Sequence, residues 1–359
     1  MSDVTLRDFN IDLKNIDISL ITMLNRYKNR MPNLKNKTDE EILDTPFSLF
    51  RKQTHNRFHK EKNFNFEIQV LSFAPYKSSG INLCLRAGDC KNYCLGIGIL
   101  RSMDSDEYHL SDPYALFYKT LKTIAFSNKE KFMEHLAISI AKLCERKRHT
   151  FKNIVFRLNG YSDIKWEDIR FTLDSKVLNS LRSRLENSLF PLYDNKVYDK
   201  FSHLNQNIIS NTLQNNYNIF ELFNGLQFYD YTKYLPTERN INISNYHLVF
   251  SYDKHLSNNI SKVDKKLDIV VIIDISIKNN ILKKKRMCKK FNIIDGDLYD
   301  FRYFDKFEFN KYNKKLGFII LLELLDGNKF KENEAFNSSY VYSNNGDNST
   351  IIKDLRDRI

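Results

Sequence analysis

Three of the chain's five cysteines lie close together in the segment "CLRAGDCKNYCLGIG", residues 84–98. Cys84, Cys90 and Cys94 follow the spacing C-x5-C-x3-C, and Tyr93 directly precedes the last cysteine. Three thiolates on a loop that contains glycine can hold three irons of a [4Fe–4S] cluster and leave the fourth iron open to an outside ligand. The same thiolates could bind Zn²⁺ together with a fourth ligand or a water.

Two other interpretations of these cysteines need no metal. Cysteine packs well as a small apolar side chain, so the three residues could simply be buried. A disulfide among them is disfavoured, because the beginning of the chain, "MSDVTLRDFNIDLKN", lacks the basic and apolar regions of a secretory signal. We therefore expect a reducing, cytoplasmic location. No apolar run reaches the roughly 18 residues of a membrane span, and no membrane partner is expected.

Polar side chains gather where strand-like segments end. The residues expected to act in catalysis are Asp163, Glu167, Tyr229, Asp230, His247, Asp295 and Asp297. Their carboxylates could bind Mg²⁺ or Mn²⁺ and activate a water molecule. Each also has a structural interpretation, because "DGD" and "NG" are good turn sequences and a histidine between apolar neighbours is often part of the core. Their shared position at strand ends favours the functional interpretation.

Seven apolar runs are predicted to form strands. They are "FEIQVLSFAP" (66–75), "NIVFRLNG" (153–160), "LQFYDYT" (226–232), "YHLVFSY" (246–252), "DIVVIID" (268–274), "FNIIDGD" (291–297) and "GFIILLELL" (317–325). Helical patterns separate several of them, as in "NKEKFMEHLAISIAKLCERKR", where Cys144 falls on the apolar face. Runs that are apolar throughout are typical of parallel strands buried on both faces.

This alternation predicts the α/β class, as a complete or partial (β/α) TIM-type barrel. Residues 1–65 would be an N-terminal helical extension, residues 66–330 a β/α barrel-like domain with the cysteine loop at 84–94, and residues 331–359 a flexible C-terminal tail. The chain contains neither GxGxxG after an early strand nor GxxxxGK[ST], so the dinucleotide-binding and P-loop classes lose their main support.

The chain is basic, with a formal net charge of +12. Its densest basic run, "KKKRMCKK", contains Lys283, Lys284, Lys285 and Arg286, which could contact the phosphates of a nucleic acid. The alternative is a compositional bias toward Lys, Asn, Ile and Tyr, in which this run is a solvated loop or helix.

Five ordered motifs resemble a family of uncharacterised phage- and virus-encoded proteins, the gene-product-eighty-eight-like proteins. The motifs are "GINLC…CKNYCLG", "RLNGYSDIKWE", "FYDYTK", "NYHLVFS" and "IDGDLYDFR", and the resemblance covers about residues 75–305. The sequence departs from the family pattern at Leu85, where proline is expected, and at Tyr161, where threonine is usual. The resemblance implies a viral or mobile-element origin and hence the host cytoplasm.

A more remote resemblance is to the radical S-adenosylmethionine enzymes. Their cysteine loop follows the first barrel strand and reads C-x3-C-x-aromatic-C, and Tyr93 occupies a position like that of the aromatic residue. Both cysteine gaps are longer here. In that family, polar residues after the second strand bind the methionine amino group of the cofactor. The resemblance therefore implies Asn159, Ser162 and Asp163 as cofactor-binding residues.

Three functions remain open from the sequence. The first is a radical-SAM-like iron–sulfur enzyme whose substrate is unknown. The second is a divalent-metal hydrolase or nuclease, in which Mg²⁺ is bound by carboxylates and the cysteine loop is a structural Zn²⁺ site. The third is a nucleic-acid-binding or virion protein without catalysis.

Overall fold

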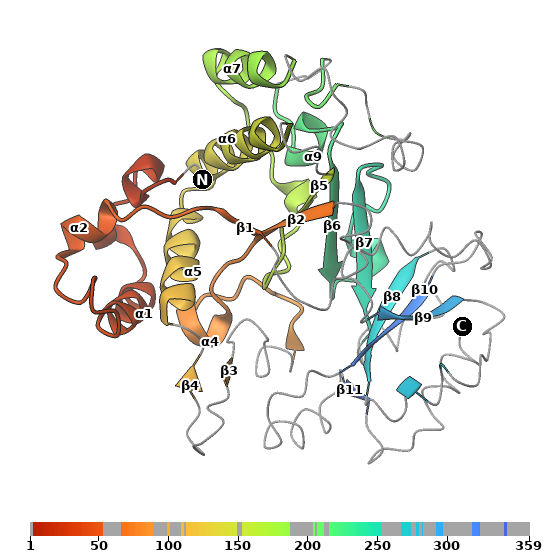
Figure 1. Cartoon of the computed structure of the whole chain (residues 1–359), viewed down its shortest axis with the longest axis horizontal. Helices are drawn as coiled ribbons and strands as arrows, with labels where there is room; N and C mark the ends of the chain where they lie inside the picture. Colours follow the sequence, from red (N-terminus) through yellow and green to blue (C-terminus); the bar gives the residue numbers. More distant parts are fainter. Residues whose placement is uncertain are drawn as a thin grey trace. The chain divides into compact units, whose positions relative to one another are not determined.

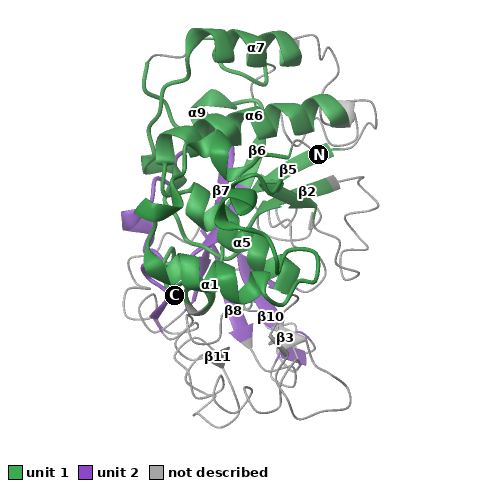
Figure 2. Cartoon of the chain, turned by 90° about the vertical axis from the view of Figure 1, so that its left-hand side faces the viewer, with its two compact units in different colours: residues 1–54, 64–84, 94–228 green, residues 55–63, 85–93, 229–359 purple. Residues whose placement is uncertain are grey.

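The structure is a computed structural model of the whole chain (Figure 1). The chain divides into two compact units, with residues 1–54, 64–84 and 94–228 in the first and residues 55–63, 85–93 and 229–359 in the second (Figure 2). The residues that the structure describes are 3–52, 66–88, 99–100, 109–110, 113–148, 153–186, 204, 207–211, 215–252, 267–273, 278–279, 282, 292–296, 318–323 and 341–342.

The first unit combines helices with the beginning of a sheet. Its helical elements are η1 (Leu6–Phe9), η2 (Leu13–Asn15), α1 (Ile18–Lys28), α2 (Asp39–Leu43), α4 (Tyr76–Ser79), α5 (Pro113–Ala125), α6 (Lys129–Arg148), η5 (Trp166–Asp168), α7 (Ser175–Glu186) and α9 (Ile219–Leu222). Its strands are β1 (Phe50–Lys52), β2 (Phe66–Leu71), β5 (Asn153–Arg157), the first two residues of β6 (Gln227–Thr232), and the separate pair β3 (Ile99–Leu100) and β4 (His109–Leu110).

The sheet of this unit runs in the order β1-β2-β5-β6. β2 and β5 are parallel, with Phe66 opposite Asn153, and β5 is parallel to the first residues of β6. β1 is antiparallel to β2, with Phe50 opposite Leu71. The segment predicted to be a helical N-terminal extension thus forms helices and also contributes an edge strand to the sheet.

An aromatic core packs α6 of the first unit against the segments that follow β2 and β5. Phe132 and Leu136 of α6 are fully buried, as the helical spacing predicts, and so is Cys144 on the same face. Phe132 packs on Phe73, which follows β2, and on Trp166 of η5. Burial of large aromatic surfaces is a major source of stability, so this cluster fixes α6 against the segments that follow β2 and β5.

The second unit contains the rest of the sheet. Its elements are the remainder of β6, η7 (Pro236–Glu238), β7 (Tyr246–Ser251), β8 (Asp268–Ile273), β9 (Asn292–Asp295), β10 (Phe318–Glu323) and β11 (Val341–Tyr342). The order is β6-β7-β8-β10-β9, and β11 also pairs with β8. The pairs β7–β8, β8–β10 and β10–β9 are parallel.

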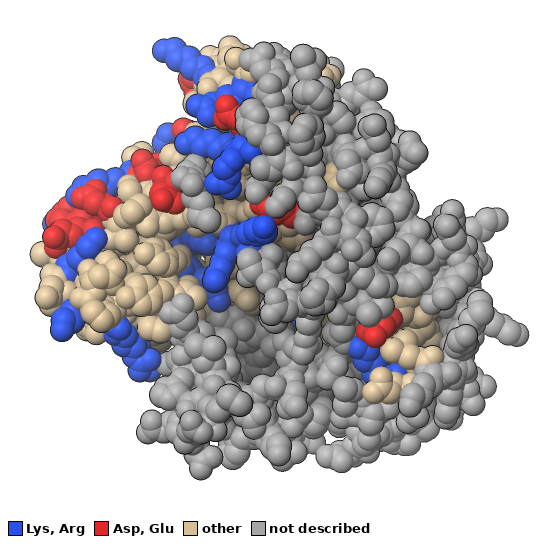
Figure 3. All heavy atoms as spheres, in the orientation of Figure 1, with Lys and Arg blue, Asp and Glu red and all other residues tan. Residues whose placement is uncertain are grey.

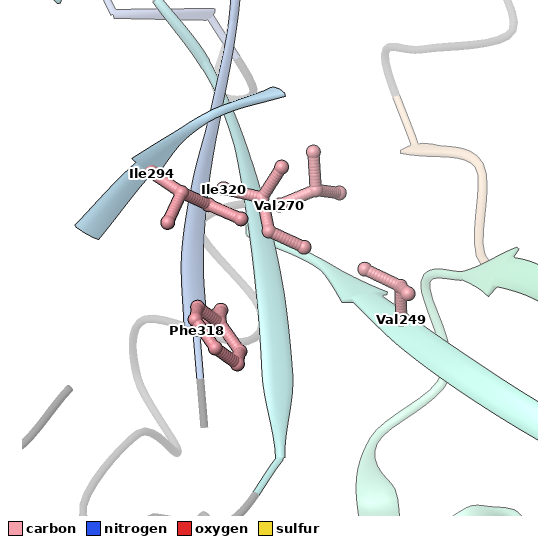
Figure 4. Packing of buried hydrophobic residues seen from close by; sticks show 5 residues of the cluster. All are labelled: Val249, Val270, Ile294, Phe318 and Ile320. Atoms are coloured by element: carbon pink, nitrogen blue, oxygen red, sulfur yellow. The ribbon is translucent and has the colours of Figure 1, made fainter. Parts of the chain in front are cut away.

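A compact apolar cluster is the core of the second unit (Figure 4). Its buried members are Val249, Val270, Ile294, Phe318 and Ile320, with Tyr231 and Leu322 packed against them. Each of the strands β7, β8, β9 and β10 contributes to it. This packing explains why these runs are apolar throughout, since parallel strands are usually covered on both faces.

The expected α/β class is confirmed, and the barrel is not. All seven predicted strands form, as β2, β5, β6, β7, β8, β9 and β10. The described strands do not close into a barrel: β1 lies antiparallel on the outer side of β2, and β9 is paired with β10 only. A closed barrel requires its first and last strands to pair. Among the described helices, none is long and apolar enough to cross a membrane.

Gly160, after β5, occupies a position where a side chain has no room. A Cβ there would lie 2.7 Å from the Val70 Cγ1 atom and 2.8 Å from the Leu71 carbonyl oxygen. We expect Gly160→Ala to lower the free energy of unfolding by about 3 kcal/mol, measured by urea denaturation. The control Ser180→Ala, at an exposed position of α7, should change it by less than about 0.5 kcal/mol. Equal stability of the two variants would contradict this packing.

Candidate functional site

The loop after β5 is organised by one side chain, Asn159. Its Oδ1 atom accepts hydrogen bonds from Ser162 Oγ at 2.8 Å, Ile164 N at 3.0 Å and Trp166 Nε1 at 3.1 Å. Its Nδ2 atom donates to the Ile164 carbonyl oxygen at 3.0 Å. The loop therefore closes on the Asn159 carboxamide, which is buried together with Ser162 and Trp166. The sequence "NGYSDIKW" folds this way because amide side chains readily replace backbone partners in turns.

The end of this loop is fixed to the core of the first unit. Trp166 is fully buried and packs on Phe73, Phe126 and Phe132. This position makes Trp166 a packing residue of the core. Glu167 is also buried, and its carbonyl oxygen accepts a hydrogen bond from Asn218 Nδ2.

The beginning of the cysteine loop meets the loop after β5 in the first unit. The Asp163 backbone N–H donates to the Leu83 carbonyl oxygen at 2.9 Å. The Cys84 thiol lies 3.6 Å from the Tyr161 carbonyl oxygen, at hydrogen-bonding distance for sulfur. The Cys84 N–H donates to Asn82 Oδ1 at 3.0 Å. Two motifs that are 77 residues apart in the sequence, at Cys84 and Tyr161, are therefore side by side.

This meeting point lies at the carboxyl ends of two parallel strands. The Gly160 N–H donates to the carbonyl oxygen of Leu71, the last residue of β2, at 2.9 Å. In open α/β sheets, ligands bind outside the carboxyl ends of the strands. Cys84 is half-buried there. Cys144, by contrast, is buried in α6, and burial raises the pKa of its thiol far above the ordinary value.

In the second unit, Asp230 belongs to a buried polar network. Its Oδ2 atom accepts a hydrogen bond from Tyr246 Oη at 2.9 Å. Arg239 donates to that same hydroxyl at 3.0 Å and to Thr232 Oγ1 at 2.8 Å. Asp230 and Arg239 are both buried, and Tyr229 beside Asp230 is fully buried in β6. The network compensates the cost of removing a carboxylate and a guanidinium from water.

His247 lies beside a carboxylate, and Asp295 lies beside an ammonium group. His247 Nε2 is 2.9 Å from Asp268 Oδ2, without the alignment of a hydrogen bond. Asp268 Oδ1 accepts a hydrogen bond from the Phe318 backbone N–H at 3.0 Å, so this carboxylate also ties the beginning of β8 to β10. Asp295, at the end of β9, forms an ion pair of 2.6 Å with Lys278, which is buried.

The predicted site residues fall into two sets. The first unit contains Cys84, Asn159, Ser162, Asp163 and Glu167, and the second contains Tyr229, Asp230, His247 and Asp295. The others lie outside the described residues: Cys90, Cys94, Lys283, Lys284, Lys285, Arg286 and Asp297. Within the described ranges, no group of three or more His, Cys, Asp or Glu side chains could hold a metal ion.

The sequence did not point to four residues that form hydrogen bonds or ion pairs in the surroundings of Asp230, His247 and Asp295. They are Tyr246, Arg239, Asp268 and Lys278. Asp268 had a visible signal, because an acidic residue opens the apolar run "DIVVIID". Lys278 lies a few residues before the basic run "KKKRMCKK" in the sequence, yet its side chain is only 5% exposed. Arg239 and Tyr246 had no such signal, since their pairing depends on how the segment between β6 and β7 folds.

Replacing Asn159 should destabilise the loop more than replacing its neighbour. Asn159→Ala leaves two buried donors and one partly buried donor without their acceptor and should lower the free energy of unfolding by about 3 kcal/mol, against about 1 kcal/mol for Ser162→Ala. Trp166 is the only tryptophan of the chain, so its fluorescence during urea denaturation reports on this loop. Equal losses in the two variants would contradict a central role for the Asn159 carboxamide.

A comparison with known proteins assigns the family but no activity. A family model described as "Gene product 88" matches residues 48–321, which is more than half of the 359 residues. No curated protein and no solved structure matches the chain. The matched region includes the cysteine loop, the loop after β5 and the network around Asp230. The resemblance to radical S-adenosylmethionine enzymes finds no support in these comparisons. The chain belongs to the gene product 88 family.

Proposed function

We propose that this protein is a metal-dependent enzyme whose cysteine loop holds the metal centre at the carboxyl ends of β2 and β5. One observation carries the proposal: the loop that begins at Cys84 packs against the loop after β5, through the Cys84–Tyr161 and Asp163–Leu83 contacts. Loops at the carboxyl edge of a parallel sheet are where α/β enzymes carry their functional groups.

The position of Cys84 fits a soft metal. Thiolates are the ligands preferred by iron–sulfur clusters and by Zn²⁺. A cysteine ligand must be able to lose its proton, and the half-buried Cys84 meets that condition better than the fully buried Cys144. Cys90 and Cys94 would supply the remaining thiolates. A [4Fe–4S] cluster bound by these three residues would supply one-electron chemistry, and its open iron would be a site for S-adenosylmethionine.

The chain's own residues would position a cofactor and exclude water. Asn159 and Ser162 hold the shape of the loop through their mutual hydrogen bond, so their contribution to a bound cofactor would be largely indirect. Asp163 is buried next to Leu83 and follows Ser162 directly, and its carboxylate is the group best suited to a cofactor amino group. A buried, preformed loop suits chemistry that has to be protected from solvent.

Metal analysis of the cysteine variants tests the proposal. Protein purified without air should contain iron and acid-labile sulfide, and Cys84→Ser, Cys90→Ser and Cys94→Ser should each lose most of both. Cys144→Ala is the matched control and should keep the metal, because its thiol is buried in α6. Reconstitution with iron and sulfide before the assay ensures that loss during purification is not mistaken for absence of a site.

The other outcomes separate the alternatives. Zinc without iron, lost in the same three variants, would overturn the iron–sulfur assignment and favour a hydrolase with a structural zinc loop. A protein without iron or zinc after reconstitution would overturn the metal centre altogether. Equal metal content in the Cys84→Ser and Cys144→Ala variants would place the metal away from the cysteine loop.

A further inference from the structure

One lysine of the first unit is buried without an anionic partner. Lys122 of α5 is 6% exposed, and within the described part of the chain it makes neither a hydrogen bond nor an ion pair. An ammonium group that leaves water without a counter-charge is costly, so such a residue is either neutral or paired with something from outside the chain. The other lysine that is buried among the described residues, Lys278, has Asp295 as its partner.

The charges around Lys122 are positive. Burial, with smaller contributions from the positive charges of Lys119 and Arg51, lowers the pKa of its ammonium group from 10.5 to about 7. Lys119 lies one turn earlier on α5, and Arg51 comes from β1. A carboxylate nearby would raise this pKa, and none of the described carboxylates acts in that sense.

Among the described elements, those that pack most extensively against α5 do not supply a counter-charge. These elements are α1, α4 and η1. Their charged residues are Arg26 and Lys28 on α1, Lys77 on α4, and Arg7 and Asp8 on η1. Asp8, the single acid among them, accepts hydrogen bonds from the backbone N–H and the hydroxyl of Thr5. The surroundings of Lys122 therefore favour an anion that comes from outside.

The lysines of α5 lie near the candidate site. Thr123 Oγ1 accepts a hydrogen bond at 3.0 Å from the N–H of Ala74, three residues beyond β2. Lys119 Nζ lies 4.2 Å from the ring centre of Tyr161, the residue whose carbonyl oxygen meets the Cys84 thiol. In Figure 3, Lys and Arg side chains gather between α5 and β1 on the face shown. A cationic surface thus adjoins the carboxyl end of β2.

We propose that Lys122, together with Lys119 and Arg51, binds a phosphate group of a ligand at the carboxyl end of β2. A phosphate group carries up to two negative charges and several strong acceptor oxygens, which suits a compact ammonium group and a planar guanidinium. The bound anion would supply the counter-charge that Lys122 lacks. This inference does not rest on the metal centre, since the three cations act whether or not the cysteine loop binds iron or zinc.

Sulfate is the probe for this site, because it keeps its two charges where phosphate esters gain a proton, near pH 6. We expect sulfate to bind the full-length protein at least about tenfold more tightly near pH 6 than near pH 9, measured by isothermal titration calorimetry. Binding should weaken as the pH rises because the cationic form of Lys122 prevails below about pH 7 and is lost above it. Inorganic phosphate should bind to the same site and compete with sulfate.

Lys122→Met keeps the length and apolar stem of the side chain and removes its charge. It should weaken sulfate binding near pH 6 by about tenfold or more and abolish most of the pH dependence. The matched control Lys142→Met, at an exposed position of α6, should bind as the original protein does. Sulfate should also raise the thermal unfolding midpoint of the original protein and of Lys142→Met, and not that of Lys122→Met.

Three results would overturn the proposal. One is equal sulfate affinity in Lys122→Met and Lys142→Met, which would place the anion elsewhere. Another is the absence of binding to the original protein at millimolar sulfate. The third applies if Lys122→Met does not fold: Arg51→Gln, at an exposed position, would then have to weaken binding, and unchanged affinity in that variant would contradict the site. Metal content, measured on the same samples, reports separately on the cysteine loop.

Discussion

The arrangement of the candidate site depends on the carboxamide of Asn159. Its oxygen accepts from a hydroxyl, a backbone N–H and the Trp166 indole, which are drawn from three different positions of one loop. Trp166 packs in the aromatic core, and its indole N–H donates to the Asn159 oxygen. The Asn159 carboxamide therefore links the loop to that core. The loop in turn presents the Tyr161 carbonyl oxygen and the Asp163 N–H to the beginning of the cysteine loop. Without this carboxamide, two buried donors and one partly buried donor would lose their partner at once.

The two units use their polar residues differently. In the first, polar groups after β5 shape a loop at the carboxyl edge of the sheet. In the second, Asp230 accepts a hydrogen bond from Tyr246, His247 lies beside Asp268, and Asp295 forms an ion pair with Lys278. Buried carboxylates held in this way keep a sheet of apolar strands in one register, because an unpaired charge would be expensive. A role for them in metal binding would require these partners to give way.

The sequence predicts the strands well because a parallel strand buried on both faces is apolar along its whole length. It does not distinguish an open sheet from a barrel, since both are built from the same β/α units; closure depends on how the outermost strands pair. The order β8-β10-β9 also lies beyond local patterns, because the short strand β9 could pair on either side. The contact between Cys84 and Tyr161 spans 77 residues and has no local signature. Trp166 and Cys144, by contrast, fall where helical spacing and size predict core residues.

Lys122 shows why charge patterns along a sequence can mislead. The clustered cations at residues 283–286 attract attention because they are dense, and dense runs are usually solvated. Lys122 lies outside any dense basic run, on α5 beside the fully buried Leu121. A lysine is ordinarily able to extend its stem and reach water. Here Lys122 is only 6% exposed, Lys119 and Arg51 add positive charge near it, and the bound anion proposed above would supply the counter-charge. The buried Lys122 is therefore more informative about a ligand than the dense basic run at residues 283–286.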